Sequence, residues 1–195
     1  MSTKTDEQDL DKEVIFEEEE EESPPRIVGI YGEIADESVS EFIGSLLGYY
    51  HDRSGPLALP VEFIISTGGG NVADMFSAYD VMRMVRKECA IHTLGVGKVM
   101  SAGVLLLAAG TKGHRRIGKY CRIMLHHVLG AEQGSVVDIG QSYEEAKVME
   151  QNMFKAIADE SSLTLEELQQ IVSKNIDVFF SAEEAVEMGI ADIIV

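Results

Sequence analysis

A serine that directly follows a predicted strand is the first candidate for chemistry in this sequence. Ser101 stands in the small-residue segment 95–103 (GVGKVMSAG), just before a predicted helix. Such a position exposes the hydroxyl and leaves the next backbone N–H free for a developing oxyanion, as in the nucleophile elbow of hydrolases. The spacing is not the hydrolase pattern G-x-S-x-G, because Gly97 lies four residues before Ser101. From this segment alone, a helix N-cap is the slightly simpler explanation of the serine.

A histidine at the end of another predicted strand is the second candidate. His126 follows the apolar run 123–125. It could be a hydrogen-bonded core residue, or a general base that reaches a hydroxyl group. A general base of this kind needs a carboxylate to orient its ring. Asp177, Asp138 and Asp192 are the candidates, and the residue pattern alone does not choose among them.

Three consecutive glycines form the third candidate. Residues 68–70 follow the predicted strand 61–65 and precede a predicted helix. Glycines at such a place allow the backbone to approach a ligand closely, with N–H groups that could cradle a phosphate or an oxyanion. The segment lacks the Lys-Ser/Thr pair of a P-loop and the spacing of the dinucleotide fingerprint, so nucleotide binding is poorly supported. Taken alone, the glycines are explained as a tight turn.

The elements that must position these residues alternate along the chain. Helical periodicity and short apolar runs indicate an α/β protein with crossover connections, and one domain accounts for residues 26–195. We expect strands at 27–31, 61–65, 91–96, 122–125, 178–180 and 191–195, and helices at 36–50, about 75–85, 101–109, 137–160, 165–173 and from 181.

The charge of the chain is strongly negative and unevenly distributed. There are 34 acidic and 16 basic residues, a net charge of −18, which argues against binding to nucleic acid or to anionic membranes. Residues 1–25 hold eleven acids, including the run 17–22, against two lysines. Such a segment cannot bury enough surface to fold, so we expect a disordered, acidic N-terminal arm that acts on approaching partners by charge repulsion.

The cysteine content and hydropathy indicate a reduced, cytoplasmic protein. Cys89 and Cys121 are far apart in apolar contexts, which is neither a disulfide framework nor a metal-ligand spacing. No segment approaches the roughly 20 apolar residues needed to span a bilayer. The N-terminus has no basic segment followed by an apolar run, so we expect no secretory signal. We also expect no metal and no cofactor.

Three blocks of the sequence together resemble the proteolytic subunits of the Clp protease (ClpP, serine peptidase family S14). They are residues 95–113 (GVGKVMSAGVLLLAAGTKG), 122–134 (RIMLHHVLGAEQG) and 177–195 (DVFFSAEEAVEMGIADIIV), in the family's order and at similar spacing. The resemblance extends from about residue 27 to residue 195. It implies a crotonase-like fold of repeated ββα units, with a protruding handle formed by Gly134 and the helix that follows.

The resemblance also implies roles for the candidate residues. Ser101 looks like the nucleophile, His126 like the general base and Asp177 like the carboxylate that orients the histidine. The oxyanion hole of the family uses backbone N–H groups, which fall here on Ala102 and on Gly70, with Gly69 as the near alternative. The implied function is that of an endopeptidase that hydrolyses unfolded polypeptides.

The assembly implied by the resemblance is two stacked heptameric rings that enclose a chamber, fed by an ATP-driven AAA+ unfoldase. The chain departs from the family pattern in four places: the turn at 67–70 lacks proline, His127-Val128 replaces Gln-Pro, Ala102 replaces the methionine or similar residue that commonly follows the serine, and the N-terminal arm is long and acidic. These departures leave a second hypothesis, a non-catalytic ring subunit that assembles with an active partner. A third hypothesis is an acyl-CoA enzyme of the crotonase superfamily. Such enzymes need no Ser-His-Asp set, so the presence of all three residues argues against it.

Overall fold

The computed structural model describes residues 25–52, 59–173 and 176–195, so the acidic segment expected to be disordered lies almost entirely outside the described residues. A seven-stranded sheet organises the described part. Its main path, β1-β2-β3-β4-β7, is parallel; β5 adds to β3 in parallel, and β6 pairs antiparallel with β5. The strands are β1 (Ile27–Ile34), β2 (Val61–Gly70), β3 (Ile91–Met100), β4 (Arg116–Ile117), β5 (Arg122–Leu125), β6 (Val178–Phe180) and β7 (Ile193–Ile194).

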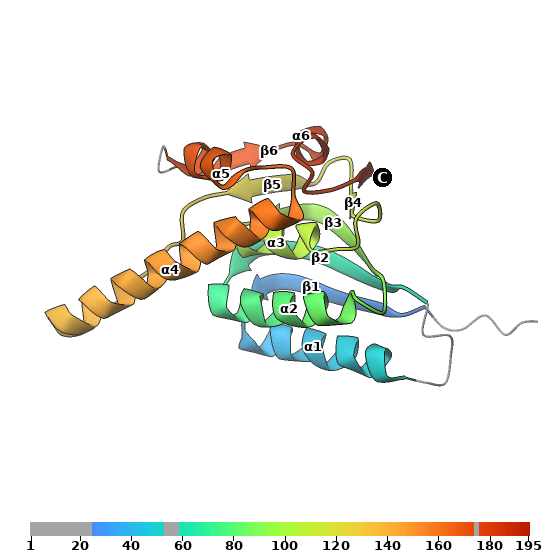
Figure 1. Cartoon of the computed structure of the whole chain (residues 1–195), viewed down its shortest axis with the longest axis horizontal. Coiled ribbons are helices and arrows are strands. Elements are labelled where there is room, and N and C mark those ends of the chain that lie inside the picture. Colours follow the sequence, from blue (N-terminus) through green and yellow to red (C-terminus); the bar gives the residue numbers. More distant parts are fainter. Residues whose placement is uncertain (1–24, 53–58, 174–175) are drawn as a thin grey trace, which may run out of the picture.

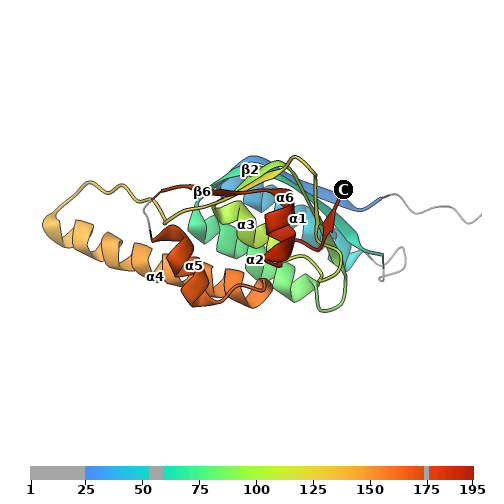
Figure 2. The ribbon, with the colours of Figure 1, turned by 90° about the horizontal axis from the view of Figure 1, so that it is seen from above.

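Helices connect the strands and gather mainly on one side of the sheet (Figures 1 and 2). This is the arrangement that parallel strands require, because each crossover has to return along the sheet. The α/β class expected from the sequence is therefore confirmed. The helices are α1 (Asp36–His51), α2 (Val72–Val85), α3 (Ala102–Ala108), α4 (Val136–Glu160), α5 (Leu165–Val172) and α6 (Ala182–Glu187).

The core lies between this sheet and its helices. Alternate residues of β2 and β3 are buried, as expected for strands with one face packed under helices. Phe42 of α1 and Phe63 of β2 meet with ring centroids 4.3 Å apart. All seven residues of α3 are buried, so this short helix is held by packing on every side. Its N-terminus, which follows Ser101, is consequently fixed in space.

Helix α4 is the most unusual element, because its first half stands away from the body of the protein (Figure 1). Ser135 and Asp138 form a capping box at its start. Its second half is anchored: Met153 and Phe154 are buried, and Glu160 at its end forms a bidentate ion pair with Arg86, the C-cap of α2 (2.7 and 3.0 Å). The handle expected at this place is therefore a projecting helix whose second half is anchored on the body of the protein.

The structure also differs from the sequence-based expectations in detail. Strand β2 continues through the glycines to Gly70, and β3 continues to Met100, because parallel pairing with neighbouring strands carries both segments past their last apolar run. Helix α1 begins at Asp36, as expected, and ends one residue later than expected, at His51. In the described part of the chain, no helix combines the length and the apolar character needed to cross a membrane.

Candidate active site

Ser101 lies at the junction of β3 and α3 in a strained backbone conformation. Its φ is 53° and its ψ is −121°, and among the described residues it is the one non-glycine with positive φ. Such a conformation costs about 1–3 kcal/mol and persists where the surroundings enforce it. Here the Ser101 N–H donates to the carbonyl of Met124 (2.8 Å), which ties the bend to the neighbouring strand β5. The sharp strand-to-helix bend is the geometry of a nucleophile elbow.

His126 follows β5 and reaches the serine. Its Nε2 lies 2.7 Å from Ser101 Oγ, and its Nδ1 lies 3.4 Å from Asp177 Oδ1. The histidine side chain is 16% exposed and that of Asp177 54%. His126 directly follows the last residue of β5, and Asp177 directly precedes the first residue of β6. Because β5 and β6 pair antiparallel, these two ends lie next to each other. The structure thus brings the three side chains into one row, hydroxyl to imidazole to carboxylate.

The two other candidate carboxylates lie elsewhere. Asp138 accepts hydrogen bonds from the N–H and the hydroxyl of Ser135 at the start of α4. Asp192 is paired with the buried Arg115, whose guanidinium donates to both of its oxygens. Hydrogen bonds from Arg115 lower the pKa of Asp192 to about 2, against a smaller opposing effect of burial. Asp177 is the carboxylate that the fold places beside the histidine ring.

Two of the three glycines are packed so closely that no side chain fits, and one of them, Gly69, lies against the serine. Gly69 has a φ of +101°, and a Cβ on it would lie 2.7 Å from Ser101 Cβ and 3.1 Å from the carbonyl of Met100. A Cβ on Gly70 would lie 2.1 Å from the carbonyl of Ile34 on β1. Both positions therefore exclude a side chain. The Gly69 N–H donates to Thr67 Oγ1 (2.9 Å), so the two glycine N–H groups are not equivalent.

Two supporting residues were not singled out from the sequence. Thr67 is fully buried, and its hydroxyl oxygen accepts the N–H of Gly69, two residues further on. Serine and threonine often hold a turn in this way, and here the bond fixes the turn that lacks proline. Glu150 of α4 faces His127 Nδ1 (3.0 Å) and accepts the Val128 N–H (2.8 Å), which holds the segment after His126. Thr67 could have been found as a local turn signal, whereas Glu150 carries no signal at sequence level.

The arrangement is suited to acyl transfer. A hydroxyl that donates to an imidazole can lose its proton as it attacks a carbonyl carbon. Ala102 is the first residue of α3, so its N–H precedes the intrahelical hydrogen bonds and faces no helical acceptor. A backbone donor next to the attacking oxygen is what a tetrahedral oxyanion needs. Among the described residues, no group of three His, Cys, Asp or Glu side chains is placed to hold a metal ion.

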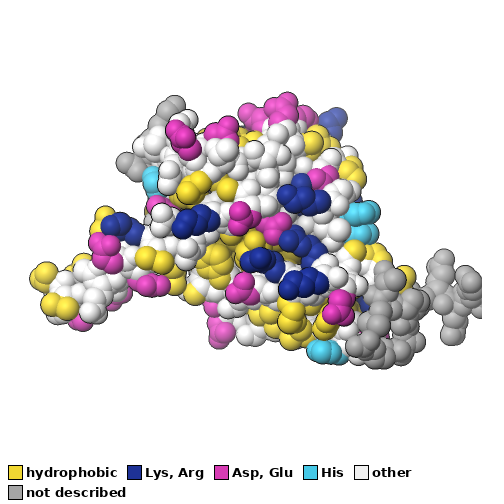
Figure 3. Space-filling view, in the orientation of Figure 1, with side chains coloured by type: hydrophobic (Ala, Val, Ile, Leu, Met, Phe, Trp, Pro, Cys, Tyr) yellow, Lys and Arg dark blue, Asp and Glu magenta, His cyan; other side chains and the backbone are white. Residues whose placement is uncertain are grey.

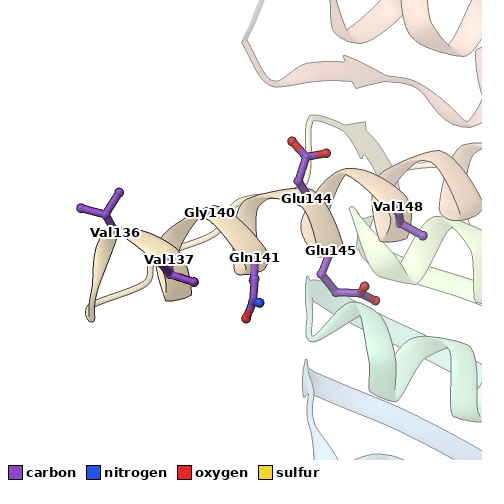
Figure 4. Close-up of a pocket in the computed structure, with 7 residues that line it drawn as sticks. All are labelled: Val136, Val137, Gly140, Gln141, Glu144, Glu145 and Val148. Carbon is purple, nitrogen blue, oxygen red and sulfur yellow. The ribbon is translucent and has the colours of Figure 1, made fainter.

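Two hollows lie away from this row of side chains. One, of about 520 Å³, runs along the free half of α4 between Val136 and Val148 (Figure 4). The other, of about 500 Å³, lies between α4 and α5 with His127 in its wall. Neither is lined by Ser101, His126 or Asp177. Ser101 and His126 are themselves partly buried, whereas Asp177 is exposed.

Comparison with known proteins points to one family. The sequence profile of the family described as Clp protease matches residues 18–195. The ATP-dependent Clp protease proteolytic subunit 1 of Gloeobacter violaceus (strain ATCC 29082 / PCC 7421) is 33% identical over 170 residues, which cover 87% of this chain and 83% of the relative. The proteolytic subunits 2 of Synechococcus sp. (strain CC9605) and Parasynechococcus marenigrum (strain WH8102) are each 33% identical over 135 residues, 69% of this chain and 66% of the relative.

The sequence and the structure lead to one family. The matched region includes every described strand and helix, and the parallel sheet with its projecting helix is consistent with the ClpP variant of the crotonase-like fold. The resemblance stated from the three sequence blocks is confirmed by the family match and by the relatives at 33% identity. The chain belongs to the Clp protease family.

Proposed function

We propose that this chain is itself a serine endopeptidase that hydrolyses peptide bonds of unfolded polypeptides. Ser101 is the nucleophile, His126 the general base and Asp177 the residue that orients the imidazole. The backbone N–H groups of Ala102 and Gly70 form the oxyanion hole. The observation that carries the proposal is the distance of 2.7 Å between Ser101 Oγ and His126 Nε2, at a serine with strained backbone.

The reaction follows from these positions. Ser101 Oγ attacks the peptide carbonyl carbon while its proton moves to His126 Nε2, and the negative charge on the carbonyl oxygen is met by the two N–H groups. The C–N bond then breaks, and His126 returns the proton to the leaving amine. A water molecule, deprotonated by the same histidine, then attacks the acyl carbon, the bond to Ser101 Oγ breaks, and His126 returns the proton to Oγ. Each lost oxyanion donor of this type costs about 10²- to 10³-fold in rate.

Gly70 is the preferred glycine donor because the alternative is occupied. The Gly69 N–H already donates to Thr67 Oγ1, so it is not available to a substrate without breaking a buried hydrogen bond. Gly70 stands one residue further along the turn and is wedged against Ile34, which fixes the direction of its peptide unit. An oxyanion donor has to be held rigidly, since its benefit depends on preorganisation.

The test is covalent labelling together with peptide hydrolysis. The assembled protein should cleave short fluorogenic peptides and react with a fluorophosphonate at Ser101, located by peptide mass spectrometry. Ser101→Ala should lose both activities. Asp177→Asn should keep the fold and lower kcat by about 10²- to 10⁴-fold, because the neutral amide no longer favours the required tautomer of His126. Wild-type protein that neither reacts nor cleaves contradicts the proposal.

We further infer that the chain works as an oligomer, as two stacked rings with an AAA+ unfoldase as partner. The free half of α4 supports this, because it exposes a row of apolar side chains that a single chain leaves uncovered. These include Val136 at 87% and Val137 at 68% exposure, and Figure 3 shows the hydrophobic surface at the free end of the projection. Native mass spectrometry of the purified protein tests the ring assembly.

A second candidate function is that of a non-catalytic subunit in a mixed ring. The loose contact of 3.4 Å between Asp177 and His126, with the carboxylate half exposed, favours this candidate. Co-expression with an active relative, followed by native mass measurement, separates the two functions. Homomeric rings that cleave peptides remove the second candidate, whereas mixed rings in which Ser101→Ala has no effect remove the first.

A further inference from the structure

Two basic side chains lie side by side on the sheet, a short way along the strands from Ser101 and His126. Lys98 of β3 and Arg122 of β5 are partners across the parallel ladder, so their side chains project to the same face. Residues two apart on a strand share a face, so Arg122 lies on the same face of β5 as Met124, and His126 follows Met124 by two residues, directly after the strand. The two cations are therefore on the face of the sheet that carries His126.

Lys98 is also directed toward the glycine turn. The register between β2 and β3 shifts between Ile65 and Thr67, and Lys98 belongs to the irregular stretch of β3 opposite that shift. Irregularities of this kind re-aim a side chain and are frequent beside active sites. The Lys98 ammonium lies 4.0 Å from the place that a Cβ on Gly68 would take. A positive charge thus stands at the edge of the turn that contacts Ser101.

No described acidic side chain forms an ion pair with Lys98 or Arg122. Both side chains are exposed, and within residues 25–52, 59–173 and 176–195 neither one forms an ion pair. Like charges directly opposite on neighbouring strands destabilise a sheet. The chain has 34 acidic residues, yet those that the structure describes leave these two cations unpaired. An anionic group bound between Lys98 and Arg122 would relieve the repulsion.

We propose that Lys98 and Arg122 form a subsite that selects substrates with an aspartate or glutamate near the scissile bond. The proposal rests on the peptidase function above and names a specificity for the same site. At a rise of about 3.3 Å per residue, the Cα atom of Lys98 lies about 10 Å from that of Ser101, and the Cα atom of Arg122 about 13 Å from that of His126. An extended peptide that follows these strands covers that span in three or four residues. The selected acidic side chain is therefore the third or fourth from the cleaved bond.

The experiment uses the full-length assembled protein and internally quenched peptides of one parent sequence. Glutamate, glutamine or lysine is placed in turn at each of the five positions on either side of the cleaved bond, and kcat/KM is measured at low and high salt. The variants are Lys98→Gln, Arg122→Gln and their combination. Lys112→Gln is the matched control, because Lys112 is also an exposed lysine but lies far from Ser101 along β3. Its neighbour Thr111 donates its N–H to the carbonyl of Ile91, at the opposite end of that strand.

We expect glutamate at the third or fourth position to raise kcat/KM about 3- to 10-fold over glutamine at low salt, and high salt to reduce this preference. Each single variant should reduce the preference and the double variant abolish it, whereas Lys112→Gln keeps it. Repulsion by the acidic N-terminal segment would act on glutamate at every position and so cannot imitate a position-specific gain. Ser101-dependent cleavage with equal rates for glutamate and glutamine at all positions overturns the subsite alone. No Ser101-dependent cleavage overturns the peptidase function and the subsite together.

Discussion

Replacing Gly69 by alanine should disable the serine, while the same change at the adjacent Gly68 should not. A Cβ at position 69 would lie 2.7 Å from Ser101 Cβ and 3.3 Å from its Oγ. Carbon atoms in contact prefer about 3.5–4.0 Å, so the serine has to move by roughly 1 Å. A displacement of this size at a reacting atom costs about 10²-fold in rate.

Backbone strain adds to the effect of Gly69→Ala. The φ of +101° is unfavourable for alanine by about 1–3 kcal/mol. For a domain of this size, that corresponds to a lowering of Tm by about 2–12 °C. Gly68 has no such restriction: the nearest atom to an added Cβ is Lys98 Nζ at 4.0 Å, an ordinary contact. Gly68→Ala is therefore the matched control on the same turn.

The assay combines three measurements on each variant. The rate of fluorophosphonate labelling at Ser101 reports the nucleophile, kcat/KM for a fluorogenic peptide reports turnover, and native mass and Tm report assembly and stability. We expect Gly69→Ala to assemble but to label and cleave about 10²-fold more slowly, with Gly68→Ala near wild type. Labelling of Gly69→Ala at the wild-type rate would refute the reasoning, and so would an equal loss in both variants.

Three further predictions concern Glu150, Asp192 and Cys121, which lie outside the row formed by Ser101, His126 and Asp177. Glu150→Ala should lower peptide hydrolysis by about tenfold because it frees the Val128 N–H, whereas Glu150→Gln, which can still accept that bond, should retain most activity; equal losses would contradict this role. Asp192→Asn should lower the free energy of unfolding by about 1–3 kcal/mol at pH 7, since it breaks the pair with Arg115. Because the folded pKa of Asp192 is depressed to about 2, the stabilisation is present above the unfolded pKa and is lost as the pH falls from about 4 to about 2, which thermal unfolding at several pH values measures. Burial raises the pKa of Cys121 to about 11, so iodoacetamide should alkylate it only after unfolding; modification of the native protein at pH 8 would be the contrary result.

Much of the fold follows from patterns that are local in the sequence. Apolar runs and helical periodicity predict the alternation of strands and helices, because the burial of one face of an element imposes its own period on the chain. The sequence pattern predicts strands β2 and β3 that are shorter than those in the structure. Their last residues, such as the glycines up to Gly70, are held in the sheet by neighbouring strands rather than by their own strand preference. Pairing between distant segments leaves no local pattern to read.

The sequence by itself determined which groups are available for chemistry: Ser101, His126, a set of aspartates and a run of glycines. Their chain order and flanking residues were sufficient to place the chain in its family, as the profile match confirms. The tertiary structure decided which aspartate stands beside the histidine, because the antiparallel pairing of β5 with β6 puts Asp177 there and Arg115 holds Asp192 elsewhere. It also decided the strained φ of Ser101, which depends on a hydrogen bond to a strand more than twenty residues away. Residue types are a property of the chain, whereas distances of 3 Å between distant residues exist only once the sheet has formed.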